Sequence, residues 1–189
     1  MIGNHNDVKE VQCSKFADSS LGKKLGTFNW DRLAIMADKS LAVMYDVYKC
    51  CPIENGEWND ERGNSKWCPD KEYVPKKANP EGKTWGQILK EHGIDGIKYK
   101  DGEPDFRPIS KGNVEIKDFS DNRADNFDKA DIGLAKQRGC SPQEIKKWRK
   151  ENSYTWHECK DMKTMQKVPS IVHNNMSHSG GISEAKKGA

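Results

Sequence analysis

Three segments decide the fold of this 189-residue chain: Tyr154-Thr155-Trp156-His157-Glu158, Met165-Gln166-Lys167-Val168-Pro169, and His173 with His178 before Gly180-Gly181. They hold three of its five histidines but only short apolar runs. A segment this poor in core-forming residues is seldom held together by apolar burial alone. Metal binding can supply the missing free energy, because the site forms only when the segment folds. The sequence therefore predicts a metal-stabilised unit in this part of the chain.

The order of residues in these segments predicts two short strands followed by a helix. Residues 155–156 and 165–168 have strand character, and polar residues 160–163 connect them. Pro169 suits the first position of a helix, because its φ is fixed near the helical value and its missing N–H is not needed there. That helix would carry Val172, His173 and Met176 before residues 177–181 end it. The pattern predicts a ββα-metal finger over about residues 153–181.

His173 and His178 are five residues apart, which is about 140° around a helix of 3.6 residues per turn. They cannot both face one cation from a continuous helix. We therefore expect the helix to end near Met176, with His178 in the following turn and His157 as the third metal ligand. Neutral imidazoles suit Zn²⁺ and other transition metals, and three protein ligands leave a coordination position open. One divalent cation is expected, with Zn²⁺ as the first choice and Mg²⁺, Mn²⁺ or Ni²⁺ as alternatives.

These motifs resemble the HNH/endonuclease VII superfamily of nucleases. The likeness is carried by Trp156-His157-Glu158, by residues 165–169, and by His173-x4-His178-Ser179-Gly180-Gly181. It is nearest to the WHH-type nuclease domains at the C-termini of bacterial polymorphic toxins, and it covers roughly residues 141–182. The resemblance implies a metal-dependent endonuclease that cuts double-stranded DNA with little sequence preference. It also implies an antibacterial toxin that is neutralised by a cognate immunity protein.

The chain departs from the family pattern at two positions. The WHH motif has a second histidine where this chain has Glu158. Nuclease colicins of the same superfamily place the metal-binding histidine first and the general-base histidine second, so His157 becomes a ligand and Glu158 the base. The reverse assignment, with His157 as base and Glu158 as ligand or orienting group, is the alternative. The asparagine of HNH, which orients the base, aligns by spacing with Thr164.

Other functions fit parts of this pattern. A structural zinc module that binds nucleic acid or protein without cutting would need a fourth ligand, and Cys159 is the nearby candidate. A zinc protease is disfavoured, because residues 157–161 lack the second histidine of HExxH and have no helical flank. An acidic nuclease signature has only superficial candidates, which are interrupted by proline: Glu103, Asp105, Glu115 and Lys117.

The basic residues are concentrated before and within the predicted finger. The whole chain has 32 Lys or Arg and 29 Asp or Glu, so its net charge of +3 does not by itself indicate nucleic acid. Residues 134–167, however, contain nine Lys or Arg and four Asp or Glu, a local net charge of +5. Beside a metal motif we expect such residues to face phosphates, with a solvated helix face as the alternative. The residues expected to bind nucleic acid are Lys146, Lys147, Arg149, Lys150, Lys160 and Lys163.

The cysteines and the apolar runs bear on where the protein acts. Six cysteines, two of them adjacent at Cys50-Cys51, have neither disulfide-framework nor CxxC spacing. Free thiols, made in a reducing bacterial cytoplasm, are therefore expected. No apolar run approaches a membrane span, and the first residues lack a signal-peptide pattern. We expect secretion or delivery into the cytoplasm of a target cell by a non-classical route.

The rest of the sequence predicts an α+β protein in which helices and a small β-hairpin region precede the finger. Residues 1–60 are interpreted as a linker with a helix over 27–48, residues 61–120 as a loop-rich α/β region, and residues 121–189 as the HNH-type nuclease domain. Strands are expected over 94–99 and 114–119, with Asp101-Gly102 as a hairpin turn.

Capping signals predict the helices of this region. Thr84 and Ser141 each begin a capping box, and Gly93 and Gly139 end the helices expected from residues 84 and 122. In the helix after Ser141, Ile145 and Trp148 are expected to face inward, with the basic residues outside.

Overall fold

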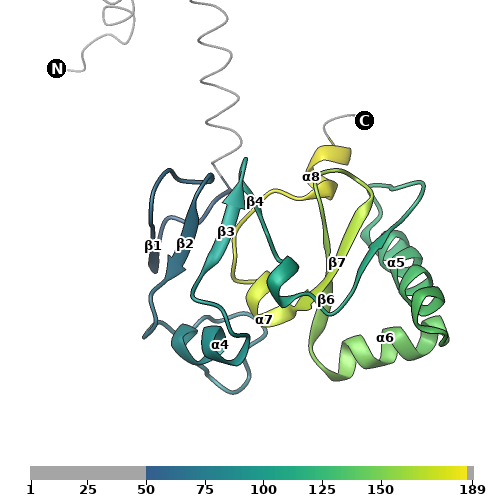
Figure 1. Cartoon of the computed structure of the whole chain (residues 1–189), viewed down its shortest axis with the longest axis horizontal. Coiled ribbons are helices and arrows are strands. Elements are labelled where there is room, and N and C mark those ends of the chain that lie inside the picture. The colour runs from purple at the N-terminus through teal and green to yellow at the C-terminus, as the bar shows by residue number, and fades with distance from the viewer. Residues whose placement is uncertain (1–49, 187–189) are drawn as a thin grey trace, which may run out of the picture. The chain divides into compact units, whose positions relative to one another are not determined.

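The structure, a computed structural model, describes residues 50–186, which belong to a compact unit spanning Val47–Ala189 (Figure 1). The predicted helix over residues 27–48 lies outside the described residues. The described part is α+β, as predicted, and contains two antiparallel sheets. None of its helices is both long and apolar enough to cross a membrane.

The first sheet has four strands in the order β1-β2-β3-β4. They are β1 (Gly56–Trp58), β2 (Lys66–Pro69), β3 (Ile97–Lys100) and β4 (Glu103–Pro104). The turn between β3 and β4 is the predicted Asp101-Gly102, and both residues have the positive φ, 51° and 75°, that a tight hairpin turn requires. This turn places Glu103 at the start of β4.

Helix α4 (Trp85–Glu91) packs against the first sheet through Trp85, Ile88 and Leu89. The predicted capping box is present: the Thr84 side chain accepts a hydrogen bond from the Gln87 N–H, and the Gln87 side chain accepts one from the Thr84 N–H. Because both orphan donors are satisfied, the helix start is fixed by local sequence.

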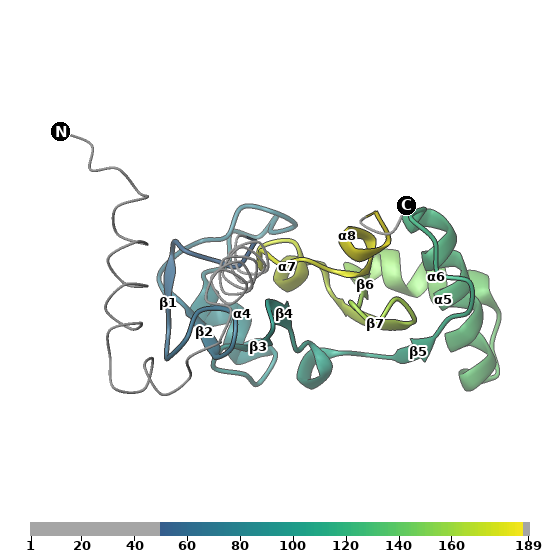
Figure 2. The same cartoon turned by 90° about the horizontal axis from the view of Figure 1, so that it is seen from above.

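The second sheet has three strands in the order β5-β7-β6: β5 (Asn113–Glu115), β6 (Tyr154–Glu158) and β7 (Thr164–Pro169). An extended segment from the short 3-10 helix η1 (Arg107–Ile109) to β5 links the two sheets (Figure 2). The central strand β7 contributes side chains to two hydrophobic cores. Val168 lies in the core beside the first sheet, and Met165 lies in the core beside the second. Residue 120, where the sequence suggested a domain boundary, comes after β5 and before β7 in the sequence. These two strands pair with each other, so the second sheet contains residues from both sides of that position.

Helices α5 (Arg123–Arg138) and α6 (Pro142–Glu151) pack on the second sheet. Asn122 caps α5 with its side chain, and Gly139 ends it with φ 66°, a conformation that favours glycine. The predicted capping box of Ser141 and Glu144 starts α6.

The inward face of α6 differs from the prediction. Ile145 is buried as expected, but the second buried residue is Arg149 rather than Trp148. The buried carboxylate of Asp131 on α5 accepts hydrogen bonds from Nη2 of Arg149 at 2.8 Å and from Nε1 of Trp156 at 2.8 Å. A buried carboxylate needs a paired cation, so Arg149 turns inward and Trp148 stays partly exposed. The expectation that Arg149 lies outside is wrong.

The chain after β7 forms two short helices. Helix α7 (Ser170–His173) has Pro169 as its N-cap and ends three residues before the predicted Met176. Helix α8 (Gly181–Ala185) follows where the sequence suggested only a terminator. A Cβ on Gly180 would lie 2.7 Å from the carbonyl oxygen of Glu158, and one on Gly181 would lie 2.6 Å from that of Cys159. The two glycines therefore allow the chain after His178 to pass close against the end of β6.

The five cysteines of the described part are free thiols, as predicted. Cys13 lies outside the described residues.

Candidate metal centre

Three histidines from separate elements face one another. His157 lies on β6, His173 ends α7, and His178 follows in the next loop. Their ring centroids are 4.9 to 5.4 Å apart, and one ligand nitrogen from each lies within 4.8 Å of the others. The fully buried ring of Phe106 packs against all three, with centroid distances of 5.0, 5.8 and 5.8 Å. The structure thus brings together the three residues that the sequence suggested as metal ligands, here called the histidine trio.

Burial keeps these imidazoles neutral. Burial first, and the neighbouring imidazole second, lower the pKa of His157 to about 3 and the pKa values of His173 and His178 to about 4. Nδ1 of His178 donates to the carbonyl oxygen of Met176 at 2.6 Å, and Nδ1 of His173 lies 3.2 Å from Oδ1 of Asn174. With the proton on Nδ1, the Nε2 lone pair of each ring is left for a ligand.

His157 supplies the strongest sign that a ligand belongs here. It is 1% exposed, and neither of its ring nitrogens has a hydrogen-bond partner in the described part of the chain. An unsatisfied buried polar group costs about 1–3 kcal/mol, which metal coordination would remove. Three neutral nitrogen donors are the chemistry that zinc and neighbouring transition metals prefer. The residues present therefore fit the predicted cation.

Glu158 is held beside the histidine trio by two side chains of α5. It is 4% exposed; its Oε2 accepts a hydrogen bond from Nε of Arg123 and its Oε1 one from Nδ2 of Asn126, each at 2.9 Å. A carboxylate can accept about four hydrogen bonds, so both oxygens keep an acceptor position. The bond to Glu158 uses the Nε–H of Arg123 and leaves its two terminal amino groups for other acceptors.

A cavity of about 180 Å³ joins these groups. Its lining residues are Arg123, His157, Glu158, His173, His178, Gly180, Gly181, Ile182 and Ser183. The volume holds several water molecules, and Arg123 is the one permanent cation among the lining residues. The arrangement therefore offers a ligand set, a carboxylate and a guanidinium to one small polar group, such as a phosphate.

Thr164, which aligns by spacing with the HNH asparagine, does not line this cavity. Its hydroxyl donates to Oδ2 of Asp161 at 2.6 Å, and Oδ1 of Asp161 accepts from the N–H groups of Lys163 and Thr164. Both side chains stabilise the turn between β6 and β7. The side-chain hydrogen bonds to Glu158 come instead from Asn126 and Arg123, which are 32 and 35 residues earlier in the sequence.

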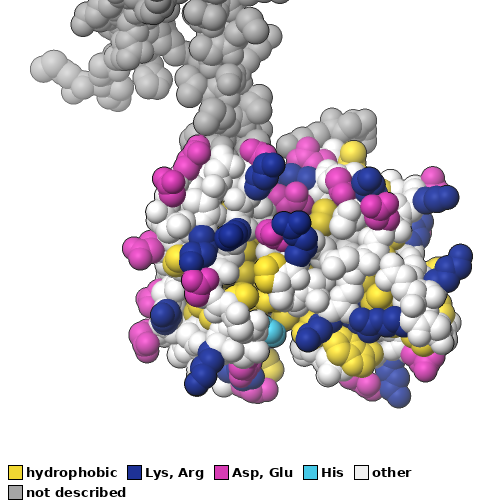
Figure 3. All heavy atoms as spheres, viewed as in Figure 1, with side chains coloured by type: hydrophobic (Ala, Val, Ile, Leu, Met, Phe, Trp, Pro, Cys, Tyr) yellow, Lys and Arg dark blue, Asp and Glu magenta, His cyan; other side chains and the backbone are white. Residues whose placement is uncertain are grey.

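None of the six residues expected to bind nucleic acid lines the cavity. Arg149 is buried. Lys146 forms an ion pair with Asp128 of α5 at 2.8 Å, and Nζ of Lys160 donates a hydrogen bond to the carbonyl oxygen of Asp101 at 2.6 Å. Lys147, Lys150 and Lys163 are exposed. On the face shown in Figure 3, Lys and Arg side chains are spread among Asp and Glu rather than gathered in one patch.

A second group of metal-ligand side chains shares His157. Glu103 of β4, His157 and Cys159 have ligand atoms within 4.8 Å of one another. Burial raises the pKa of the Glu103 carboxyl and that of the Cys159 thiol. Glu103 and Cys159 line a separate depression of about 520 Å³, together with Asp105, Arg107 and Asp161 among others.

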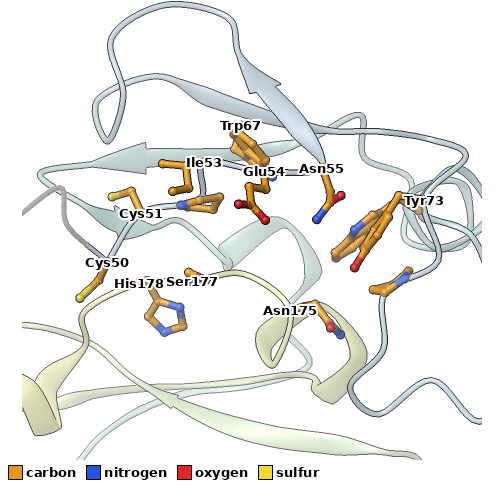
Figure 4. A pocket seen from close by; sticks show the side chains of 13 residues that line it. Cys50, Cys51, Ile53, Glu54, Asn55, Trp67, Tyr73, Asn175, Ser177 and His178 are labelled. Atoms are coloured by element: carbon orange, nitrogen blue, oxygen red, sulfur yellow. The ribbon is translucent and has the colours of Figure 1, made fainter.

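A larger pocket of about 700 Å³ also reaches the centre (Figure 4). Trp67 and Tyr73 contribute aromatic surface to it, Asn55 and Asn175 contribute amides, and His178 lines both this pocket and the smaller cavity. Of the histidine trio, His178 is the member that lines this larger pocket.

Residues 96–180 match the family model of the DNase/tRNase domain of colicin-like bacteriocins. The matched region covers less than half of the chain, and it contains the histidine trio, Glu158, Arg123 and Asn126. This region is therefore similar to a nuclease toxin domain. The similarity begins at β3, well before the C-terminal motifs, so it includes Glu103 and the whole second sheet. No curated protein matches the chain significantly.

Proposed function

We propose that the chain is a metal-dependent HNH-type endonuclease that hydrolyses phosphodiester bonds of double-stranded DNA with little sequence specificity. The observation that carries the proposal is the meeting of three neutral imidazoles with Glu158 and Arg123 in one cavity, within the region similar to a nuclease toxin domain. Strands β6 and β7 with helix α7 would form the ββα-metal finger. The histidine trio would hold one divalent cation, with Zn²⁺ as the first candidate.

Each side chain of the cavity has its own role in this proposal. When bound, the cation supplies Lewis acidity to the scissile phosphate and stabilises negative charge on the leaving oxygen. Glu158 accepts the proton of the attacking water at a carboxylate oxygen. Asn126 and Arg123 hold that carboxylate in position through their 2.9 Å hydrogen bonds. The terminal amino groups of Arg123 bind a phosphate oxygen, since guanidinium groups form strong charge-assisted hydrogen bonds with phosphate.

Glu158 is proposed as the base and His157 as a ligand, because their surroundings differ. The His157 ring lies among the other two imidazoles and Phe106, with no hydrogen-bond partner for either nitrogen in the described part of the chain. The Glu158 carboxylate faces the same cavity but is already fixed by two donors. A fixed acceptor beside an open coordination position is what water activation requires.

The non-catalytic zinc module is less well supported. Its expected fourth ligand was Cys159, but among the described residues Cys159 groups with Glu103 and His157, and not with His173 or His178. The histidine trio therefore keeps an open position, as hydrolytic metal sites do.

The role as an antibacterial toxin, delivered into a target cell and neutralised by an immunity protein, is part of the same proposal. It rests on the similarity of residues 96–180 to a bacteriocin domain. Expression of the chain in a bacterial cytoplasm should then stop growth, and the variant Glu158→Gln should restore growth.

Plasmid incubation tests the proposed activity. The full chain is incubated with supercoiled DNA, with a chelator, and with Zn²⁺, Mg²⁺, Mn²⁺ or Ni²⁺ added after chelation. Nicked and linear DNA should form with at least one of the ions and should not form in the presence of the chelator. DNA that is retarded on a gel but uncut under every condition would favour the binding module. A parallel incubation with structured RNA defines the substrate.

A further inference from the structure

Glu103 and Cys159 place a carboxylate and a thiol beside the same imidazole that belongs to the histidine trio. His157 and Cys159 are two residues apart in an extended segment, so their side chains lie on one face. The Cys159 N–H donates to the carbonyl oxygen of Thr164 at 2.9 Å, which continues the pairing of β6 with β7 by one residue. Glu103 reaches them from β4, where its Oε1 accepts a hydrogen bond from the Lys160 N–H at 2.7 Å.

The orphaned nitrogens of His157 point to a ligand on this side as well. Nε2 of His157 is 3.7 Å from Oε1 of Glu103, which is too long for a hydrogen bond. Glu103 therefore does not satisfy the imidazole, and among the described residues both ring nitrogens stay unpartnered in a side chain that is 1% exposed. An ion between the three side chains would satisfy the imidazole and the carboxylate together.

The donor set selects the kind of ion. Zinc lies about 2.3 Å from thiolate sulfur and about 2.0–2.2 Å from nitrogen and oxygen ligands. The three ligand atoms lie within 4.8 Å of one another, so they would have to approach one another by only about 1 Å to hold an ion between them. Sulfur and imidazole ligands favour Zn²⁺ and softer ions over Mg²⁺ or Ca²⁺. We propose that Glu103, His157 and Cys159 form a second metal site for a thiophilic divalent ion such as Zn²⁺ or Cd²⁺, and that this site competes with the histidine trio for His157.

The competition follows from the chemistry of one imidazole. A neutral imidazole has a single lone pair, so His157 serves one ion at a time. When the ion binds, a bond forms between Sγ of Cys159 and the metal, and the thiol proton passes to water. Occupation of this site removes one ligand from the histidine trio. An excess of a thiophilic ion therefore inhibits cleavage, a consequence that rests on the proposed nuclease function, whereas the site itself does not.

Cobalt spectroscopy tests the site without any assay of cleavage. Co²⁺ replaces Zn²⁺ in such sites, and a cobalt–thiolate bond absorbs strongly in the near ultraviolet. The full-length variant His178→Ala breaks the histidine trio and frees His157, so added Co²⁺ should give the thiolate band. The band should vanish in His178→Ala/Cys159→Ser and persist in His178→Ala/Cys140→Ser. Cys140 is a matched control, because it is also a partly buried free thiol, at the junction of α5 and α6.

A band that survives Cys159→Ser, or no band in His178→Ala at saturating Co²⁺, overturns the second site. Circular dichroism checks that each variant is folded. Should His178→Ala not fold, Cd²⁺ titration of the wild-type chain and of Cys159→Ser decides instead, since only the wild type should develop the cadmium–thiolate band.

Inhibition is then measured relative to the zinc-dependent rate of each protein. Loss of a supporting group commonly costs about 10- to 100-fold in metal affinity, so the Cd²⁺ concentration that halves the rate should rise at least about tenfold in Cys159→Ser. Equal sensitivity of the two proteins would show that the sites do not compete. If no form cuts DNA, the proposed nuclease function fails, while the cobalt spectra still decide the second site.

Discussion

Replacing Glu158 by glutamine should separate the chemical step from the other properties of the site. Glutamine has nearly the same shape, and its amide oxygen can still accept the hydrogen bond from Asn126. It has no negative charge for Arg123 and cannot accept a proton from water. We therefore expect cleavage to slow by about 100- to 10,000-fold, the usual contribution of a general base, while the metal and the DNA stay bound.

The structural cost of this substitution is expected to be much smaller. The Arg123 side chain is 61% exposed, so solvent screens its ion pair with Glu158. The Glu158 side of the pair is buried, and hydrogen bonds to charged groups contribute about 1.5–3 kcal/mol, of which we expect the lower end here. A loss of about 1.5 kcal/mol corresponds to about 3–6 °C in melting temperature for a chain of this size. Glu158→Gln should therefore remain folded at room temperature.

Single-turnover nicking, metal content by mass spectrometry and DNA retention are measured together on wild type, Glu158→Gln and His157→Ala. Glu151→Gln is the matched control, because Glu151 is an exposed glutamate at the end of α6, and it should behave as wild type. His157→Ala should lose the metal. Wild-type cleavage by Glu158→Gln, with a metal-loaded but inactive His157→Ala, would invert the assignment and make His157 the base.

Changing Lys147 and Lys150 to glutamine should lower the slope of log affinity against log salt by about 0.9 for each phosphate that α6 no longer binds, and an unchanged slope would make α6 a solvated helix. Asp131→Ala should lower the free energy of unfolding in urea by about 3–5 kcal/mol, because it leaves Arg149 buried without its anion. The exposed neighbour Asp128→Ala should change it by about 0.5 kcal/mol or less, and equal losses would refute the buried network. In metal-free protein the histidine trio has pKa values lowered to about 3–4. Between these values and about pH 6.5 the histidines bind protons in the unfolded chain but not in the folded chain. The free energy of unfolding is therefore highest above about pH 6.5, and it falls as the pH drops below that value, by up to about 1.4 kcal/mol per pH unit for each histidine. Coinciding urea midpoints at about pH 7.5 and about pH 5 would contradict this.

The elements whose signals are local could be predicted from the sequence. The capping boxes at Thr84 and Ser141 fixed two helix starts, because each involves residues only three positions apart. The strand character of residues 155–156 and 165–168 indicated the strand pair, and the five-residue spacing of His173 and His178 required the loop that the structure contains. Helix α8 was not predicted, because Gly180-Gly181 resembles a helix terminator. In the structure the two glycines allow the backbone to pass close to the end of β6.

The features that depend on tertiary pairing could not be predicted. Nothing near Glu158 in the sequence indicates Asn126 and Arg123, which lie in the first turn of an ordinary helix 32 and 35 residues away. The inward turn of Arg149 depends on Asp131, 18 residues earlier, and an amphipathic pattern alone favours Trp148 for that position. Glu103 meets Cys159 only because the two sheets of the unit pack together.

Metal content and plasmid nicking, measured on the same samples, test most directly whether the histidine trio holds the cation that cleavage needs. The samples are wild type, His173→Ala, His178→Ala and the control His92→Ala, whose histidine caps α4 and lies outside the trio. We predict that wild type and His92→Ala retain a divalent ion and nick the plasmid. His173→Ala and His178→Ala should lose nicking and the ion of the histidine trio, and any ion that they still hold through Cys159 should be lost on the further change Cys159→Ser. Full metal content and full cleavage in either His173→Ala or His178→Ala would contradict the three-histidine centre.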